Sequence, residues 1–139
     1  MVARRNFRNI ILCDAVYVDQ STHKAVIAGV YIGDILLPSI PGGVRLSLYG
    51  EYIPDTTGDI DLELSTYLDR KLQYTGKMRL SNPVVGQPTM LIAPNLQLNI
   101  DTPSILSIRA SVDGARPIEL LKKRLDVRTD TSSSVAPSC

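Results

Sequence analysis

The chain has 139 residues, a net charge of +1, 44% hydrophobic residues and 21% charged residues, a composition ordinary for one soluble globular domain. A net charge this close to zero gives no general attraction to nucleic acid or acidic membranes, and no apolar run approaches the ~18 residues of a membrane span. Tryptophan is absent and aromatic residues are few, so valine, isoleucine and leucine must fill the core.

The first residues are basic, with arginines at positions 4, 5 and 8 ahead of a short apolar run that Asp14 ends after four residues. No small-residue cleavage site follows a proper apolar region, which argues against a secretory signal. We expect residues 1–9 to form a solvated basic arm and residues 10–128 to form the folded domain. The Ser/Thr-rich residues 129–139 are expected to be a flexible tail.

Residues 10–18 and 25–37 are apolar in both alternating registers, a pattern typical of strands that are covered on both faces. A polar turn separates the two segments, which predicts a hairpin, and Gly29 and Gly33 suggest bulges or close backbone approach. A two-layer sandwich buries only one face of such a hairpin, so the other face needs a cover. We predict a protein interface there, most simply a contact between copies of this chain, made by one set of residues: Ile11, Ala15, Tyr17, Ala25, Ile27 and Tyr31. If the register of the hairpin differs by one residue, the mirror set on the opposite face is expected to form this interface instead. The internal alternative is that residues 81–95 or the tail fold over this face.

The middle of the chain predicts strands over residues 44–53, 60–68 and 72–80, each apolar on one face and polar on the other. A proline- and glycine-rich break at residues 38–43 precedes them, and a further break covers residues 81–88.

The second and third of these strands place charged side chains opposite each other if they form a hairpin around residues 69–71. Asp61 then lies opposite Arg79, and Glu63 opposite Lys77. Exposed cross-strand ion pairs of this kind contribute about 0.2–1 kcal/mol each.

The last part of the chain predicts three short strands over residues 96–100, 106–111 and 118–127, separated by Asp-Thr-Pro-Ser and Asp-Gly turn signals. We expect these strands to form one half of a sandwich, with the facing sheet supplied by the earlier chain. A change of phase in the last strand predicts a bulge at Leu120 and Leu121. No segment of helical length shows the i, i+3, i+4 pattern, so the predicted fold is an all-β, two-layer antiparallel β-sandwich of about eight strands.

The carboxylates of Asp55, Asp59, Asp61 and Glu63 suggest a calcium site, because calcium takes oxygen ligands from a loop rim. Their spacing fits no EF-hand loop, and it sets the last three along one strand face, where they cannot converge on a point. We favour the ion-pair interpretation and expect neither a metal nor a cofactor.

His23 is the only histidine of the chain and lies in the polar turn of the expected hairpin. A Ser–His–Asp triad or a Cys–His dyad would have to use this histidine. The sequence has no G-x-S-x-G motif for a nucleophilic serine, and Cys13 lies within an expected strand. We interpret His23 as a solvated turn residue and expect the protein not to be an enzyme. The alternative is a catalytic site built from Asp14, Asp34 and His23.

Two cysteines, Cys13 and Cys139, do not form a disulfide framework. We expect one buried apolar cysteine and one exposed terminal thiol rather than a bridge between them, which fits a reducing, cytoplasmic compartment. The basic residues 122–124 and the arginines of the arm have no aromatic stacking residues beside them, so we expect no nucleic-acid partner.

The N-terminal half resembles a family of small, uncharacterised bacterial proteins of unknown function. The resemblance rests on the runs LCDAVYVD and AVIAGVYIGDILLPSIP, and it spans roughly residues 8–127. The residues that match the family's pattern are Leu12, Cys13, Asp14, Gly29, Val30, Tyr31, Asp34, Ile35 and Pro38. The resemblance implies an immunoglobulin-like β-sandwich and no particular activity. This chain departs from the family at Ser104 and Leu106, where glycine and tyrosine would stand, so a tyrosine corner is not available.

The sequence therefore favours a non-enzymatic β-sandwich that acts as an interaction or structural module through protein–protein contacts. The expected partner is another protein or a second copy of the chain, in a homo-oligomer, with neither nucleic acid nor membrane involved. The alternative is a structural subunit of a virion or filament, in which the arm and the tail reach into neighbouring subunits.

Overall fold

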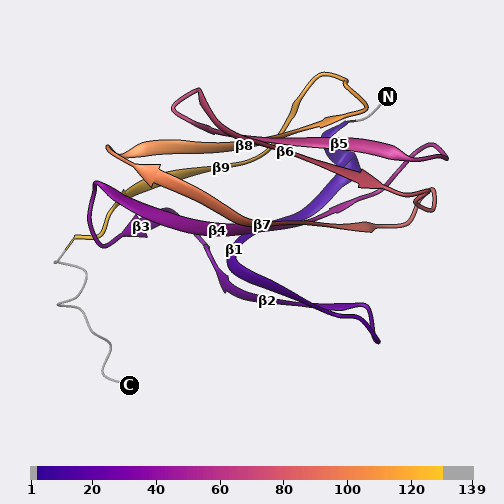
Figure 1. Ribbon diagram of the computed structural model, residues 1–139, viewed down its shortest axis with the longest axis horizontal. Helices are drawn as coiled ribbons and strands as arrows, with labels where there is room; N and C mark the ends of the chain where they lie inside the picture. The colour runs from indigo at the N-terminus through magenta and orange to yellow at the C-terminus, as the bar shows by residue number, and fades with distance from the viewer. Residues whose placement is uncertain (1–2, 130–139) are drawn as a thin grey trace.

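The computed structural model describes residues 3–129, which form nine β-strands and one short 3-10 helix (Figure 1). No helix in this part of the chain is long and apolar enough to cross a membrane. The elements, in chain order, are η1 (Arg4–Asn6), β1 (Phe7–Asp19), β2 (Lys24–Val30), β3 (Ile35–Leu37), β4 (Gly42–Tyr52), β5 (Ile60–Leu68), β6 (Lys71–Leu80), β7 (Thr89–Ile100), β8 (Ser104–Val112) and β9 (Ile118–Val127).

The strands form two facing sheets, with the order β2-β1-β4-β7 in sheet A and β3-β9-β8-β5-β6 in sheet B. Neighbours are antiparallel, except that β3 runs parallel to β9. β4 lies beside β7 in sheet A, and β8 lies between β5 and β9 in sheet B. These neighbours correspond to strands B and E, and to strands C, F and G, of the immunoglobulin fold. The predicted all-β, two-layer sandwich is confirmed, with nine strands where about eight were predicted.

The core lies between the two sheets and is built from leucine and isoleucine at alternate strand positions, because successive side chains point to opposite faces of a strand. Each sheet contributes in this way, and the most deeply buried members include Leu12, Leu46, Leu48, Ile100, Leu62, Leu106, Ile108 and Leu125. On β8 the predicted inward set is confirmed, since Leu106, Ile108 and Ala110 are all buried.

The grouping of the last three predicted strands into one half of the sandwich is wrong. The strand at residues 96–100 is the end of β7, which pairs with β4 in sheet A, whereas β8 and β9 lie in sheet B. Residues 101–103 therefore carry the chain from one sheet to the other. Alternation shows which face of a strand is buried, but it does not show which strand lies beside it, so the pattern could not distinguish the two sheets.

Other predicted boundaries also differ from the structure. β1 begins at Phe7 rather than at residue 10, because Phe7 is buried and its ring packs against that of Tyr52, with the centroids 5.0 Å apart. The segment at residues 25–37 is divided between β2 in sheet A and β3 in sheet B. Gly29, at φ +70°, lies just before the point where β2 ends, at a backbone conformation that side chains with a Cβ rarely adopt.

The bulge predicted at Leu120 and Leu121 is confirmed. Ile108 pairs with Leu121 and Arg109 pairs with Glu119, which leaves Leu120 as the extra residue of β9. The predicted tail falls almost wholly on residues 130–139, which lie outside the described residues.

Candidate functional site

The most unusual feature of the fold is the hairpin of β1 and β2, whose outer part projects beyond the other strands of sheet A (Figure 1). β1 pairs with β4 only as far as Cys13, which lies opposite Ser47. From Ala15 to Asp19 it pairs with β2 alone. The outer part of the hairpin, residues 15–28, is therefore a two-stranded ribbon, and such a ribbon is at best marginally stable in water without further packing.

The two faces of the ribbon both carry apolar side chains. Tyr17 lies opposite Val26 on one face, and these side chains are 62% and 60% exposed. Val16 lies opposite Ile27 on the other face, and both are partly exposed. Each face also has a further pair, of Ala15 with Ala28 and of Val18 with Ala25.

The six predicted interface residues do not share one face. The hydrogen-bond register places odd-numbered residues of β1 opposite even-numbered residues of β2, so Tyr17 and Ile27 point to opposite sides. Ala15 lies on the side of Tyr17, and Ala25 on the side of Ile27. The single-face grouping is wrong because it assumed a register that differs by one residue, which reverses the direction of every side chain on a strand. The remaining two residues, Ile11 and Tyr31, lie outside the ribbon and are half-buried.

β2 also forms an edge of sheet A, and within residues 3–129 no strand pairs with its outer side. Natural proteins protect such edges with charged residues, proline or bulges that prevent pairing with another chain. The sequence of β2, KAVIAGV, offers only Lys24 at its first position and Gly29 near its end. The central part of this edge has none of these protections.

Four of the residues that carry the family resemblance contact one another at the base of the hairpin: Leu12, Asp14, Gly29 and Tyr31. The Tyr31 hydroxyl donates to Asp14 Oδ1 at 2.9 Å, and the Tyr31 N–H donates to the Leu12 carbonyl at 2.9 Å. A Cβ at Gly29 would collide with the Asp14 side chain unless that side chain moved, and the φ of +70° strains any residue with a Cβ at this position. Burial, together with the bond to Asp14, raises the pKa of Tyr31 to about 12.

Cys13 is fully buried and free, as predicted, and burial raises the pKa of its thiol. A raised pKa keeps the sulfur protonated near neutral pH, which makes it a poor nucleophile. Cys139 lies outside the described residues.

The residues of the alternative catalytic site do not come together. His23 lies in the turn at the tip of the ribbon, and Asp14 lies at its base beside Gly29, about five residues or ~16 Å away along the strands. Asp34 is exposed in the segment that leads to β3. Within residues 3–129 no group of three or more His, Cys, Asp or Glu side chains could hold a metal ion.

The predicted ion pairs on the acidic strand are confirmed. Asp61 pairs with Arg79, with 3.3 Å between Oδ1 and Nε, and Glu63 pairs with Lys77, with 3.9 Å between Oε2 and Nζ. Asp59 also approaches Arg79, at 3.8 Å. All of these side chains are solvent-exposed, so the pairs contribute little to stability.

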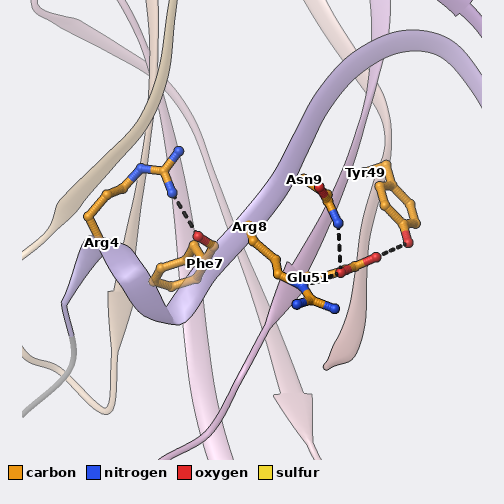
Figure 2. A network of polar contacts seen from close by, with 6 residues as sticks. All are labelled: Arg4, Phe7, Arg8, Asn9, Tyr49 and Glu51. Carbon is orange, nitrogen blue, oxygen red and sulfur yellow. Dashed lines mark hydrogen bonds and ion pairs between the residues drawn. The ribbon is translucent and has the colours of Figure 1, made fainter. Parts of the chain in front are cut away.

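A second polar cluster, which sequence reasoning missed, joins the start of β1 to β4 around Glu51 (Figure 2). Arg8 Nε and Asn9 Nδ2 donate to Glu51 Oε1 at 2.8 and 3.0 Å, and the Tyr49 hydroxyl donates to Oε2 at 2.7 Å. These bonds, chiefly that of Arg8, lower the pKa of Glu51. No local pattern in the sequence could have found this cluster, because Arg8 and Glu51 become neighbours only when β1 pairs with β4.

We expect Glu51→Gln to lower the free energy of unfolding by about 1 kcal/mol near pH 7, because charge-assisted hydrogen bonds are lost. The pKa of Glu51 is lower in the folded state than its ordinary value of 4.5, so its contribution is present above that value. It is lost as the pH falls through the folded-state pKa. Urea unfolding should therefore show the gap between variant and wild type closing toward about pH 3. The control Glu63→Gln removes an exposed pair and should shift stability by no more than ~0.5 kcal/mol. If the difference in unfolding free energy between Glu51→Gln and the wild type does not change with pH, the ionised Glu51 carboxylate is not the source of this stability.

Comparison with known proteins assigns this chain to no family. No protein-family model matches the chain, and no curated protein matches it. Among solved structures, the chain is similar to the CARDB domain of a protein from Pyrococcus furiosus, crystallised in complex with di-metal ions. The identity is 8%, the match covers 88% of this chain and 97% of that chain, and the TM-score is 0.43. A likeness at this level carries no information on the ligands or partners of this chain.

Proposed function

We propose that this chain is a non-enzymatic β-sandwich module that acts through protein–protein contacts, and that its contact surface is the β1–β2 ribbon. The observation that supports the proposal is the ribbon itself, which exposes apolar side chains on both faces and leaves the edge of β2 unpaired within residues 3–129. Apolar surface of this kind is costly in water unless another surface covers it.

A second copy of the same chain is the occupant that fits this edge best. Antiparallel pairing of β2 with its own copy creates a two-fold contact, in which the unpaired edge of one copy covers its equivalent and apolar side chains of the two edge strands lie beside each other. If this pairing is centred on Ile27, Lys24 comes opposite Val30 of the other copy, so no like charges meet. The two ribbons then form a four-stranded sheet, which is more stable than either ribbon alone.

The test is the mass of the protein in solution, measured by size-exclusion chromatography with light scattering over a range of concentrations. We expect a dimer for the wild type and a monomer for Ile27→Lys, because the new ammonium group has to be desolvated in the contact. The circular dichroism spectrum should stay unchanged, since the ribbon is not part of the core.

The matched control is Ile32→Lys, which makes the same chemical change at a side chain that is 93% exposed and lies beyond the end of β2. It should remain dimeric. A wild type that is monomeric at the highest soluble concentration overturns self-association as the role of the ribbon. An open-ended series of masses instead of a dimer supports the alternative of a filament or virion subunit.

A further inference from the structure

The outer face of sheet B carries a groove of about 790 Å³ that lies over β5, β6 and β8 and reaches the turn between β8 and β9. A hollow of about 230 Å³ adjoins it, and the two share Tyr67 and Arg109. This surface is on the opposite sheet from the β1–β2 ribbon, so a ligand bound here is independent of any contact that the ribbon makes.

Arg109 is the central cation of the groove, and its charge is not neutralised. The carbon of its guanidinium group lies 4.9 Å from the centroid of the Tyr67 ring, a cation–π contact that holds the side chain in place. Among the described residues Arg109 forms no ion pair. Glu119 lies opposite it on β9 and keeps its negative charge, but it forms no ion pair with Arg109 and accepts a hydrogen bond from the Ser107 hydroxyl at 3.0 Å.

The charges along the groove differ between its two ends. The hollow around Arg109 is also lined by Arg70 and Lys122, against a single acidic residue, Asp69. The Asp69 carboxylate already accepts the backbone N–H of Ile105 at 2.9 Å. With Glu119 beside the hollow, this end has three cations and two carboxylates, an excess of one positive charge.

The other end of the groove has no such excess of positive charge. Its acidic residues, Asp61 and Glu63, are paired with Arg79 and Lys77. A long polyanion laid along the whole groove would meet these carboxylates, whereas a ligand with one or two negative charges can place them at the Arg109 end alone.

We propose that this groove binds an extended acidic segment of a partner protein, with a carboxylate of the segment held by Arg109. The planar guanidinium group matches a carboxylate through two parallel N–H···O bonds, and its contact with Tyr67 fixes it beforehand, which reduces the entropy lost on binding. The Ser65 hydroxyl, also in the groove, can donate to or accept from the backbone of such a segment, and the Ser111 hydroxyl, which donates to the Ala115 carbonyl at 2.6 Å, can accept from it.

The experiment is a two-dimensional NMR titration of the full chain with a blocked tetrapeptide, acetyl-Ala-Glu-Glu-Ala-amide. We expect saturable shifts of the amide signals of Tyr67, Arg109 and Lys122, and weaker binding as salt is added. The peptide in which glutamine replaces both glutamates should produce no shifts, since the carboxylates carry the contact.

Arg109→Met removes the charge and keeps an apolar stem over Tyr67, and we expect it to weaken binding at least tenfold. Lys122→Met is a second variant on the rim of the same hollow, and it should weaken binding several-fold even if Arg109→Met fails to fold. The matched control is Arg45→Met, which removes an exposed arginine from β4 in sheet A and should leave binding unchanged.

Three results would overturn the proposal. They are the absence of any shift at millimolar peptide, an equal loss of affinity in Arg45→Met and Arg109→Met, and shifts that lie outside the groove. Tighter binding of a short oligothymidylate with the same dependence on Arg109 would assign the groove to nucleic acid instead.

Discussion

Leu106→Ala is expected to lower the free energy of unfolding by about 2–5 kcal/mol, one of the two largest effects that we predict for a single substitution. Leu106 is 0% exposed and lies on β8, which has neighbours on both sides in sheet B. Removing its side chain leaves a cavity between the sheets that the surrounding strands cannot close, because their backbones are fixed by pairing on either side. Urea unfolding, analysed with an unchanged m-value, measures the loss directly.

The control for this substitution is the preceding residue of the same strand. Ile105 points to the outer face and is 37% exposed, so Ile105→Ala should cost less than about 1 kcal/mol. Equal losses at the two positions would show that the inward and outward faces of β8 have been assigned incorrectly.

Asn6→Ala is the second substitution for which we expect a large loss, of about 2–4 kcal/mol, although residue 6 falls within the segment predicted to be a solvated arm. The Asn6 amide donates to the Ile53 carbonyl at 2.8 Å and to Asp55 Oδ2 at 3.0 Å, and its Oδ1 accepts the N–H of Ala3 at 2.8 Å. The side chain is buried, so its loss removes three hydrogen bonds and leaves the half-buried Ile53 carbonyl without this partner.

Thermal or urea unfolding of Asn6→Ala beside Arg5→Ala tests this expectation. Arg5 is the exposed neighbour in η1, and its replacement should change stability by no more than ~0.5 kcal/mol. If the two variants are equally stable, Asn6 does not take part in the cooperative fold, and the result supports the expected solvated arm instead.

The parts of the fold that the sequence could predict are those decided by neighbours along the chain. The hairpin of β5 and β6 is the clearest case, because its two strands follow each other in the chain and alternation sets their faces. The turn is one residue shorter than expected, since Leu68 pairs with Lys71, but a bulge between Thr66 and Tyr67 restores the expected pairs of Asp61 with Arg79 and of Glu63 with Lys77. The bulge at Leu120 could be found for the same reason, since it interrupts an alternation within one strand.

The parts that could not be predicted depend on contacts between distant segments. Nothing in the alternation of β7 indicates that it pairs with β4 rather than with β8. The burial of Asn6 depends on Ile53 and Asp55, which lie far along the chain. Without knowledge of those partners, a polar residue among three arginines is expected to be solvated.

The candidate sites also combine features that the sequence could predict with features that depend on contacts between distant segments. The apolar character of both faces of the hairpin could be seen in the sequence, but the grouping of its residues by face could not, because that depends on a register. The groove on sheet B had no sequence signal, since Tyr67 and Arg109 come from strands that are adjacent only in the fold.

The parallel pairing of β3 with β9 has a consequence for how the protein forms during synthesis. Ile35 pairs with Leu125, about ninety positions later, and within the described residues β9 is the only strand beside β3. At ~5–20 residues per second, a ribosome needs on the order of ten seconds to add that length of chain. During that interval the apolar side chains of Ile35 and Leu37 have no place in the sandwich. Sheet B therefore cannot be completed in the order of synthesis, because β3, which is made early, can pair only after β9 has left the ribosome.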